Sequence, residues 1–173
     1  RTPLAILYRP PESPIGEAFL NLVRADTEAE RVTQVRAEGS AVRQLWKRLN
    51  AGGVVGILPD QQPKAGDGEF APFFGVQALT MTLLGRLAAR TGATVLFAYC
   101  ERIDTHPDHP AFALRIEAAP DGIADPDPQR ACIALNAAVE RIARRDPAQY
   151  QWTYKRYTLR PSGNGDDNPY RSR

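Results

Sequence analysis

The sequence predicts an α/β fold with a mainly parallel central sheet flanked by helices. Short apolar segments, which indicate buried strands, alternate with segments whose apolar residues recur at helical spacing. The chain has 173 residues, of which 43% are hydrophobic, enough for one domain with a well-packed core. Because no linker interrupts residues 1–160, we predict a single domain there, followed by a flexible polar tail over residues 161–173.

The first elements are a strand, a helix and a weaker extended segment. Residues 4–8 form an apolar run that predicts a short buried strand, and the prolines after it end the strand. Residues 31–36 are more polar and indicate a weak strand or a turn. Between them a helix is predicted, because apolar residues recur on one face at Ile15, Phe19, Leu22 and Val23.

A second helix and the strongest strand follow. Ser40 is a suitable N-cap residue, and Gly52 provides the C-terminal stop. The continuous apolar run at residues 54–58 predicts a central strand covered on both faces, followed by a loop from Pro59 to Gly75. The apolar face of the second helix comprises Val42, Leu45, Trp46 and Leu49.

The last part of the domain contains two helices and two strands. Residues 93–99 predict a buried strand, and the alternation over residues 112–118 predicts a half-exposed edge strand. A long final helix has its apolar face at Leu135, Ala138, Val139 and Ile142. The third helix of the chain, which ends at Gly92, is marked by Leu79, Leu83, Leu84, Leu87 and Ala88.

The totals exclude several classes of protein. A formal net charge of +2 is too small for a typical nucleic-acid binder. No Cys/His cluster has the spacing of metal ligands and no glycine motif fits a nucleotide, so we predict no metal and no cofactor. Cys100 and Cys132 have apolar neighbours and are expected to be reduced, buried thiols. The apolar runs fall far short of the roughly 20 residues of a membrane span.

Asp60 is the first candidate functional residue. It follows the strongest predicted strand, and ligands of open α/β sheets bind beyond the carboxyl ends of the strands. A carboxylate there can orient a base, hold a substrate hydroxyl or pair with an arginine. Position alone favours the alternative, which is an aspartate that stabilises a turn.

Three phenylalanines in the following loop form the second candidate. Phe70, Phe73 and Phe74, together with Pro72, make a stiff apolar ridge. The ridge can line a groove for an acyl chain or enter a membrane surface. It can equally pack into its own domain, and the residues do not decide between these interpretations.

The third set of candidates is cationic. Arg9 and Arg24 could bind phosphate, because a guanidinium offers two parallel donors, although a solvated surface charge is the commoner role. Residues 149–157 mix aromatic rings with Lys155 and Arg156. Such a mix suits a membrane interface, but we favour a terminal segment that anchors itself on the core and leaves Lys155 and Arg156 free to meet anions.

Several short motifs occur in order along the chain, and each is modest alone. Together they resemble the lipid A biosynthesis lauroyl/myristoyl acyltransferase family, the late acyltransferases of lipopolysaccharide synthesis, over residues 4–161. The motifs are Tyr8-Arg9-Pro10, Arg24, Leu58-Pro59-Asp60-Gln61, Phe73-Phe74-Gly75, Leu87-Ala88-Ala89-Arg90-Thr91-Gly92-Ala93 and Pro147-Ala148-Gln149-Tyr150-Gln151-Trp152.

The resemblance implies a fold similar to glycerol-3-phosphate acyltransferases and work at the cytoplasmic face of the inner membrane. It implies transfer of an acyl chain from acyl carrier protein to a hydroxyl of a lipid A precursor. Asp60 and Arg24 are then expected to support catalysis. The residues expected to bind substrate are Arg9, Gln61, Phe73, Phe74, Lys155 and Arg156.

The family's general base is a histidine in a His-x-x-x-x-Asp/Glu motif, in which the acid holds the tautomer of the imidazole. Neither His106 nor His109 has a carboxylate five positions later, and the motif is expected upstream of Tyr8. We therefore expect that an N-terminal part, with the motif and a membrane-anchoring helix, is missing and that residues 1–173 alone are inactive. The competing interpretations are an inactive lipid-binding or regulatory domain on the same fold, or an enzyme that acts on another glycolipid.

Overall fold

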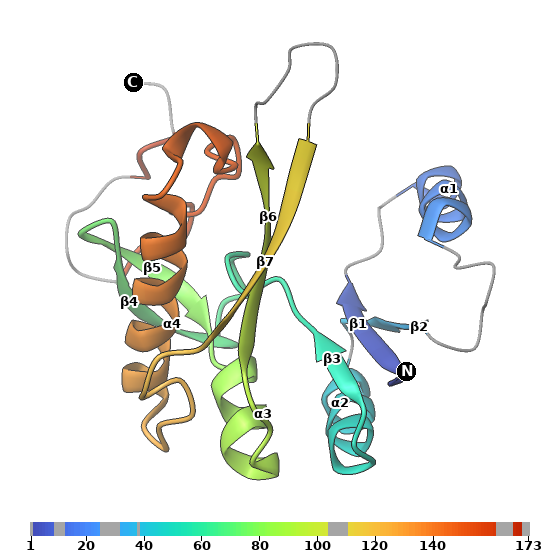
Figure 1. The fold of residues 1–173 in the computed structure, drawn as a ribbon. Helices are drawn as coiled ribbons and strands as arrows, with labels where there is room; N and C mark the ends of the chain where they lie inside the picture. Colours follow the sequence, from blue (N-terminus) through green and yellow to red (C-terminus); the bar gives the residue numbers. More distant parts are fainter. Residues whose placement is uncertain are drawn as a thin grey trace. The chain divides into compact units, whose positions relative to one another are not determined.

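A computed structural model describes residues 2–8, 13–24, 32–37, 39–103, 111–161 and 168–170 (Figure 1). The chain divides into two compact units, residues 1–58 and residues 59–173. That residues 1–160 form one domain stays a prediction. Most of the tail predicted at residues 161–173 lies outside the described residues.

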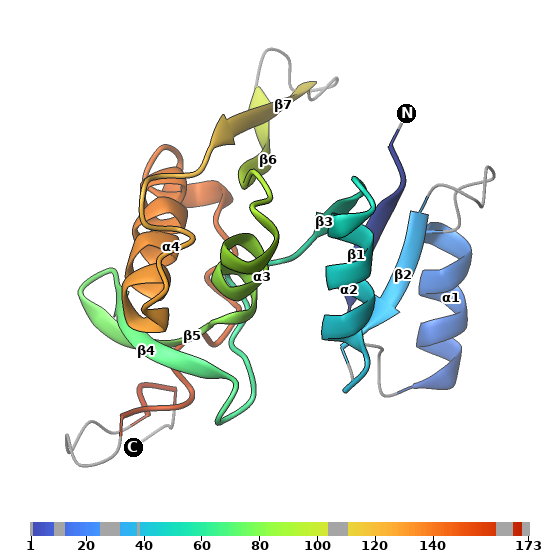
Figure 2. The same ribbon diagram turned by 90° about the horizontal axis from the view of Figure 1, so that it is seen from below.

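The first unit is built on a three-stranded parallel sheet with the order β2-β1-β3. Helix α2 packs against all three strands and buries Leu45 completely (Figure 2). On the sheet, Ala5 and Val35 are buried as well. The elements of this unit are β1 (Leu4–Tyr8), α1 (Pro14–Arg24), β2 (Val32–Arg36), α2 (Ala41–Asn50) and β3 (Val54–Gly56).

The structure confirms most of the predictions for this unit and corrects one. Strand β1 and helix α1 lie where they were predicted, and the weak segment at residues 31–36 contains a strand. The prediction of a central strand at residues 54–58 is wrong for the described sheet. β3 is short and lies at the edge, with Val54 47% exposed, whereas β1 pairs on both sides. An apolar run indicates an extended segment, but it does not identify the strands that pair with it.

The second unit contains two antiparallel strand pairs and two helices. Helix α4 packs along β4 and against α3 (Figure 1), and Asp127 caps it by accepting a hydrogen bond from the Gln129 amide. Part of the core is formed by Phe97, Ile123 and Leu135. The elements are β4 (Gly68–Phe73), β5 (Val76–Met81), α3 (Leu83–Thr91), β6 (Leu96–Ile103), β7 (Ala111–Ala118), α4 (Pro128–Ala143) and the 3-10 turn η1 (Pro147–Gln149).

The loop predicted up to Gly75 and the helix predicted from Leu79 are wrong over residues 68–81, which form the β4–β5 hairpin. Phe74 and Gly75 make its turn with φ values of 49° and 76°, and positive values at both positions suit a tight hairpin. Leu79 is buried in β5, and α3 begins only at Leu83. Among the described residues the parallel sheet has three strands, and the fold is mixed α/β with a smaller parallel part than predicted.

The β6–β7 ribbon differs from the expected pair of strands in what it buries. β6 was predicted to be buried, but only Phe97 of its residues is. β7 is an edge strand as predicted, but none of its residues is buried and its apolar side chains are the exposed ones: Phe112, Leu114 and Ile116 are 58%, 68% and 61% exposed. Next to Ile116, the carboxylate of Glu117 pairs with Arg141 of α4 and with Arg145, which lies just after this helix. Ion pairs therefore link the ribbon to this helix.

The two cysteines differ in burial. Cys132 is buried, and burial raises the pKa of its thiol, whereas Cys100 is exposed. The prediction of two buried thiols is thus confirmed for Cys132 and wrong for Cys100. Of the helices that the structure describes, none is both long and apolar enough to cross a membrane.

The close approach of α3 to α4 yields the first test. An alanine at Gly85 would place its Cβ 2.9 Å from the Cβ of Ala131 and 3.0 Å from the oxygen of Ile123. Alanine gains about 1 kcal/mol of helix propensity over glycine, but overpacking costs about 1–3 kcal/mol. We expect Gly85→Ala to lower the free energy of unfolding by about 1 kcal/mol in urea titrations.

The control is Gly39→Ala, because an added Cβ at Gly39 meets no atom within 4 Å. We expect its unfolding free energy to stay within about 0.5 kcal/mol of wild type. A Gly85→Ala variant that is more stable than wild type would show that α3 and α4 are not in close contact.

Candidate functional site

The candidate site lies in the second unit, on the loop that carries Asp60 and Gln61. The loop is tied to the C-terminal segment, residues 150–159, at Gln62. The backbone N–H of Gln62 donates to the hydroxyl of Tyr154 at 2.9 Å. Its side-chain Oε1 accepts from the N–H of Leu159 at 3.2 Å. The C-terminal segment therefore holds the loop through both the backbone and the side chain of one residue.

Arg156, in the middle of the C-terminal segment, is a deeply buried cation. Its side chain is 3% exposed and donates to the carbonyl of Leu79 and, at 3.0 Å, to Oγ1 of Thr80. Thr80 is itself fully buried. Burial lowers the pKa of Arg156, and the nearby charge of Asp60 is among the effects that oppose this shift. The guanidinium thus attaches the C-terminal segment to β5.

Asn136 of α4 completes this polar network. Its Nδ2 donates to Oγ1 of Thr80 at 2.8 Å and to the carbonyl of Ala71 at 3.2 Å. The Thr80 hydroxyl in turn donates to the carbonyl of Ala78 at 2.9 Å. The hydroxyl therefore donates once and accepts twice, from Asn136 and Arg156, which satisfies its full hydrogen-bonding capacity. One buried hydroxyl links the hairpin, α4 and the C-terminal segment.

Aromatic rings pack beside this network. The Phe73 and Phe74 centroids are 4.8 Å apart, and Phe74 lies 5.2 Å from Trp152. Tyr150 and Trp152 are also 4.8 Å apart, and all three pairs have the edge-on geometry that aromatic pairs prefer. The guanidinium of Arg144 lies 4.8 Å from the Phe74 centroid. The phenylalanine ridge therefore packs within its own unit, and the C-terminal segment anchors itself on it.

Asp60 is partly buried and lies within electrostatic reach of this cluster. The pKa of Tyr150 is raised to about 12, first by burial and then by the negative charge of Asp60. Of the predicted site residues, the structure thus brings together Asp60, Phe73, Phe74 and Arg156. A carboxylate in this position can orient a base or a substrate hydroxyl.

The other predicted residues are placed less closely or lie outside the described residues. Gln61 and Lys155 are exposed. Arg9 lies outside the described residues, and Arg24 ends α1 with a side chain that the structure does not describe. The prediction that Arg156 stays free to meet anions is wrong, because its guanidinium is buried and hydrogen-bonded. Phe73 is likewise 2% exposed, so its ring faces the interior of the unit.

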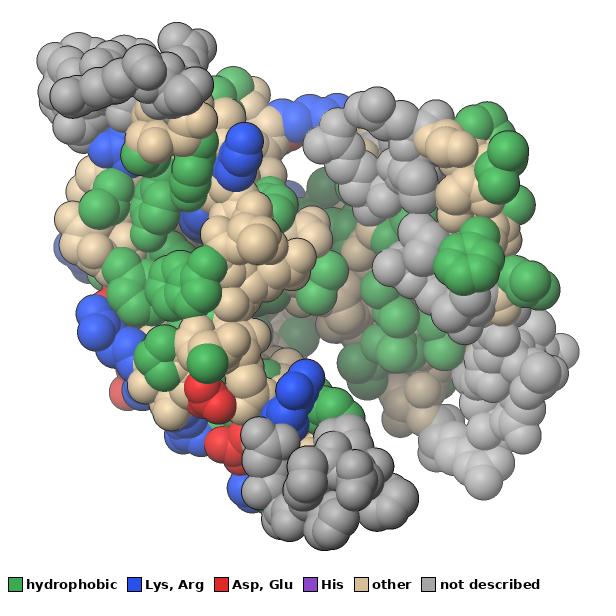
Figure 3. Space-filling model, turned by 90° about the horizontal axis from the view of Figure 1, so that it is seen from above, with side chains coloured by type: hydrophobic (Ala, Val, Ile, Leu, Met, Phe, Trp, Pro, Cys, Tyr) green, Lys and Arg blue, Asp and Glu red, His purple; other side chains and the backbone are tan. Residues whose placement is uncertain are grey.

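Sequence reasoning missed the residues that hold the site together. Thr80 and Asn136 belong to no sequence motif. Their structural role is visible only from their burial, which the sequence does not show. Tyr154 lay within the aromatic segment but was not distinguished from its neighbours. It is 38% exposed and Trp152 is 51% exposed. Hydrophobic side chains form several groups on the face of the molecule that Figure 3 shows.

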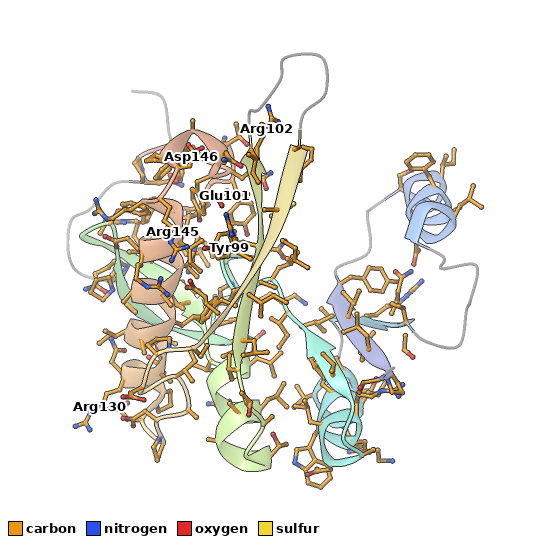
Figure 4. All side chains as sticks on the ribbon, in the orientation of Figure 1. Tyr99, Glu101, Arg102, Arg130, Arg145 and Asp146 are labelled. Carbon is orange, nitrogen blue, oxygen red and sulfur yellow. The ribbon has the colours of Figure 1, made fainter. Side chains whose placement is uncertain are left out.

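A second charged cluster joins the β6–β7 ribbon to the end of α4 (Figure 4). Arg145 pairs with Glu117 at 3.2 Å and also donates to the hydroxyl of Tyr99. The backbone N–H of Arg102 donates to Gln149 at 2.7 Å. This cluster consists of satisfied ion pairs and hydrogen bonds, which is typical of a structural role. Among the described residues, no group of three or more His, Cys, Asp and Glu side chains could hold a metal ion.

The burial of Arg156 leads to a stability test with a matched neighbour. Arg156→Met leaves buried acceptors on Leu79 and Thr80 without this donor, so we expect the free energy of unfolding to fall by about 1–3 kcal/mol. Lys155→Met changes the adjacent, exposed side chain, and we expect a change within about 0.5 kcal/mol. Equal effects of the two substitutions in urea unfolding would argue against the buried network.

Comparison with known proteins finds similarity to proteins of lipid A biosynthesis. An alignment of 143 residues is 29% identical to the lipid A biosynthesis palmitoleoyltransferase of Escherichia coli (strain K12) and covers 75% of this chain and 44% of that protein. Identity and coverage are the same for a lipid A biosynthesis acyltransferase of Shigella flexneri, so the chain spans less than half the length of these relatives. Residues 4–158 match the sequence model described as bacterial lipid A biosynthesis acyltransferase, and the chain therefore belongs to this family.

Proposed function

We propose that the complete protein transfers a fatty acyl chain from acyl carrier protein to a hydroxyl of a lipid A precursor in lipopolysaccharide biosynthesis. The observation that carries this proposal is the family match over residues 4–158. The similarity to a palmitoleoyltransferase supports a fatty acyl group as the transferred group. In this reaction the thioester C–S bond of the donor breaks, a C–O bond to the acceptor forms, and the hydroxyl proton passes through a base to the leaving thiolate.

The proposed roles of this chain's residues are supporting ones. Deprotonation of the hydroxyl needs a general base, which the family resemblance assigns to a histidine outside these residues. We propose that the Asp60 carboxylate orients that base or the acceptor hydroxyl, and that Arg24 also supports catalysis. The partly buried position of Asp60 near Arg156 supports its role. Exposed Gln61 and Lys155, together with Arg9, are proposed contacts to the polar and phosphate groups of the acceptor.

We further propose that the complete protein has a fold like that of glycerol-3-phosphate acyltransferases and works at the cytoplasmic face of the inner membrane. Helix α1 supports an interfacial location, because three of its described apolar side chains face solvent. Ile15, Phe19 and Leu22 are 82%, 63% and 76% exposed in this structure. An exposed apolar helix face of this kind suits contact with the headgroup region of a bilayer.

The alternative function is a catalytically inactive lipid-binding or regulatory domain on the same fold. Neither His106 nor His109 has a carboxylate five positions later, which is the sequence feature that keeps this alternative open. An acyl-transfer assay of the complete protein with acyl carrier protein as donor separates the two. Retained binding to anionic lipid without turnover would favour the alternative, and transfer only to a different glycolipid would change the assigned acceptor.

Asp60→Ala and Arg24→Ala in the complete protein test the supporting roles. We expect each to lower the turnover number by at least about tenfold while the unfolding transition stays near that of wild type. Asp67→Ala and Arg43→Ala are the controls, because both change exposed side chains of the same kind in the same two units. Wild-type rates in the Asp60 and Arg24 variants would reject their assignment.

An assay of residues 1–173 alone tests separately whether the general base lies outside this chain. We expect no turnover above background, because the proposed general base lies outside this chain. The complete protein, assayed in parallel with the same donor and acceptor, is the positive control. Turnover by residues 1–173 at a rate near that of the complete protein would show that the base lies within this chain.

A further inference from the structure

The loop that carries Asp60 is held by a hydroxyl that no motif of the sequence singles out. Tyr154 is 38% exposed, and its hydroxyl accepts a hydrogen bond from the backbone N–H of Gln62 at 2.9 Å. Gln62 is two residues beyond Asp60. A hydrogen bond to this amide restricts the backbone of the loop where it leaves the carboxylate.

The segment that carries Tyr154 is itself held by hydrogen bonds to the rest of the unit. Arg156, two residues further on, is buried and donates to the carbonyl of Leu79 and to Thr80. Leu159 then donates its N–H to the Gln62 side chain at 3.2 Å. Gln62 therefore bonds to the C-terminal segment at two positions, one before Arg156 and one after it. Its backbone binds Tyr154, and its side chain binds Leu159.

We propose that Tyr154 is a positioning residue that fixes the loop at Gln62 and so aims the Asp60 carboxylate. The inference rests on the proposed acyl transfer and adds a residue to its site. Misplacement of a functional group by about 1 Å can cost about 100-fold in rate, so one backbone hydrogen bond can matter to catalysis without touching substrate. Tyr154 itself does not take part in the chemical step.

Tyr154→Phe removes only the hydroxyl and keeps the ring. Tyr157→Phe is the matched control, because its hydroxyl donates to the carbonyl of Phe73 at 2.9 Å and holds the hairpin instead of the loop. In the complete protein we expect Tyr154→Phe to lower kcat by about tenfold and to leave KM within about twofold. The reason is that the substitution disturbs the orientation of the Asp60 carboxylate and not the binding of substrate. Tyr157→Phe is expected to keep kcat within about twofold of wild type.

A double-mutant cycle shows whether Tyr154 acts through Asp60. In an Asp60→Asn background, we expect Tyr154→Phe to cause no further loss of kcat, because the carboxylate that it positions is gone. A general weakening of the structure would instead lower kcat by the same factor in both backgrounds. Full kcat in Tyr154→Phe, or equal losses with and without Asp60, would overturn the proposal.

Hydrogen exchange at the Gln62 amide tests the contact without any activity. In residues 1–173 we expect Tyr154→Phe to speed exchange of this amide by at least about tenfold, with no change in Tyr157→Phe. An unchanged rate in Tyr154→Phe would also overturn the proposal. If the complete wild-type protein shows no acyl transfer while exchange responds as expected, the proposed function fails and the positioning contact stands.

Discussion

The second unit depends on a buried guanidinium that must find all its hydrogen-bond partners inside the protein. A buried charge without partners costs several kcal/mol, so the Arg156 side chain can occupy its place only when the β5 backbone and the Thr80 hydroxyl are both presented to it. Thr80 is in turn shared with Asn136 of α4. This requirement fixes the position of the C-terminal segment. The C-terminal segment in turn fixes the position of the Asp60 loop through its hydrogen bonds to Gln62.

The support and the loop that carries Asp60 are separate parts of the second unit. The hairpin, α4 and the C-terminal segment form a support that is held together by ring contacts and by a buried polar network. The loop at Asp60 lies on this support with Gln61 exposed next to it. In the acyl transfer proposed for this member of the lipid A acyltransferase family, the support would place the Asp60 carboxylate, and the proposed base would come from elsewhere in the complete protein.

The sequence predicts the local elements better than their pairing. Periodic apolar residues located α1, α2 and α4, and the glycine after α3 marked its end, because these signals depend only on neighbours along the chain. The hairpin was missed because Leu79 fits a helical spacing with Leu83, although it lies in a strand. The candidate site was predicted at Asp60, but the burial of Arg156 was not, since Thr80 and Asn136 lie 76 and 20 residues away from it in the sequence.

The coupling between Arg156 and Thr80 tests this account most directly. Arg156→Met, Thr80→Val and the double variant complete a cycle of unfolding free energies measured in urea on residues 1–173. Because the two side chains share a buried hydrogen bond, we predict a coupling energy of about 1–2 kcal/mol, with the double variant less destabilised than the sum of the single ones. Additivity within about 0.3 kcal/mol would contradict the claim that this network holds the site.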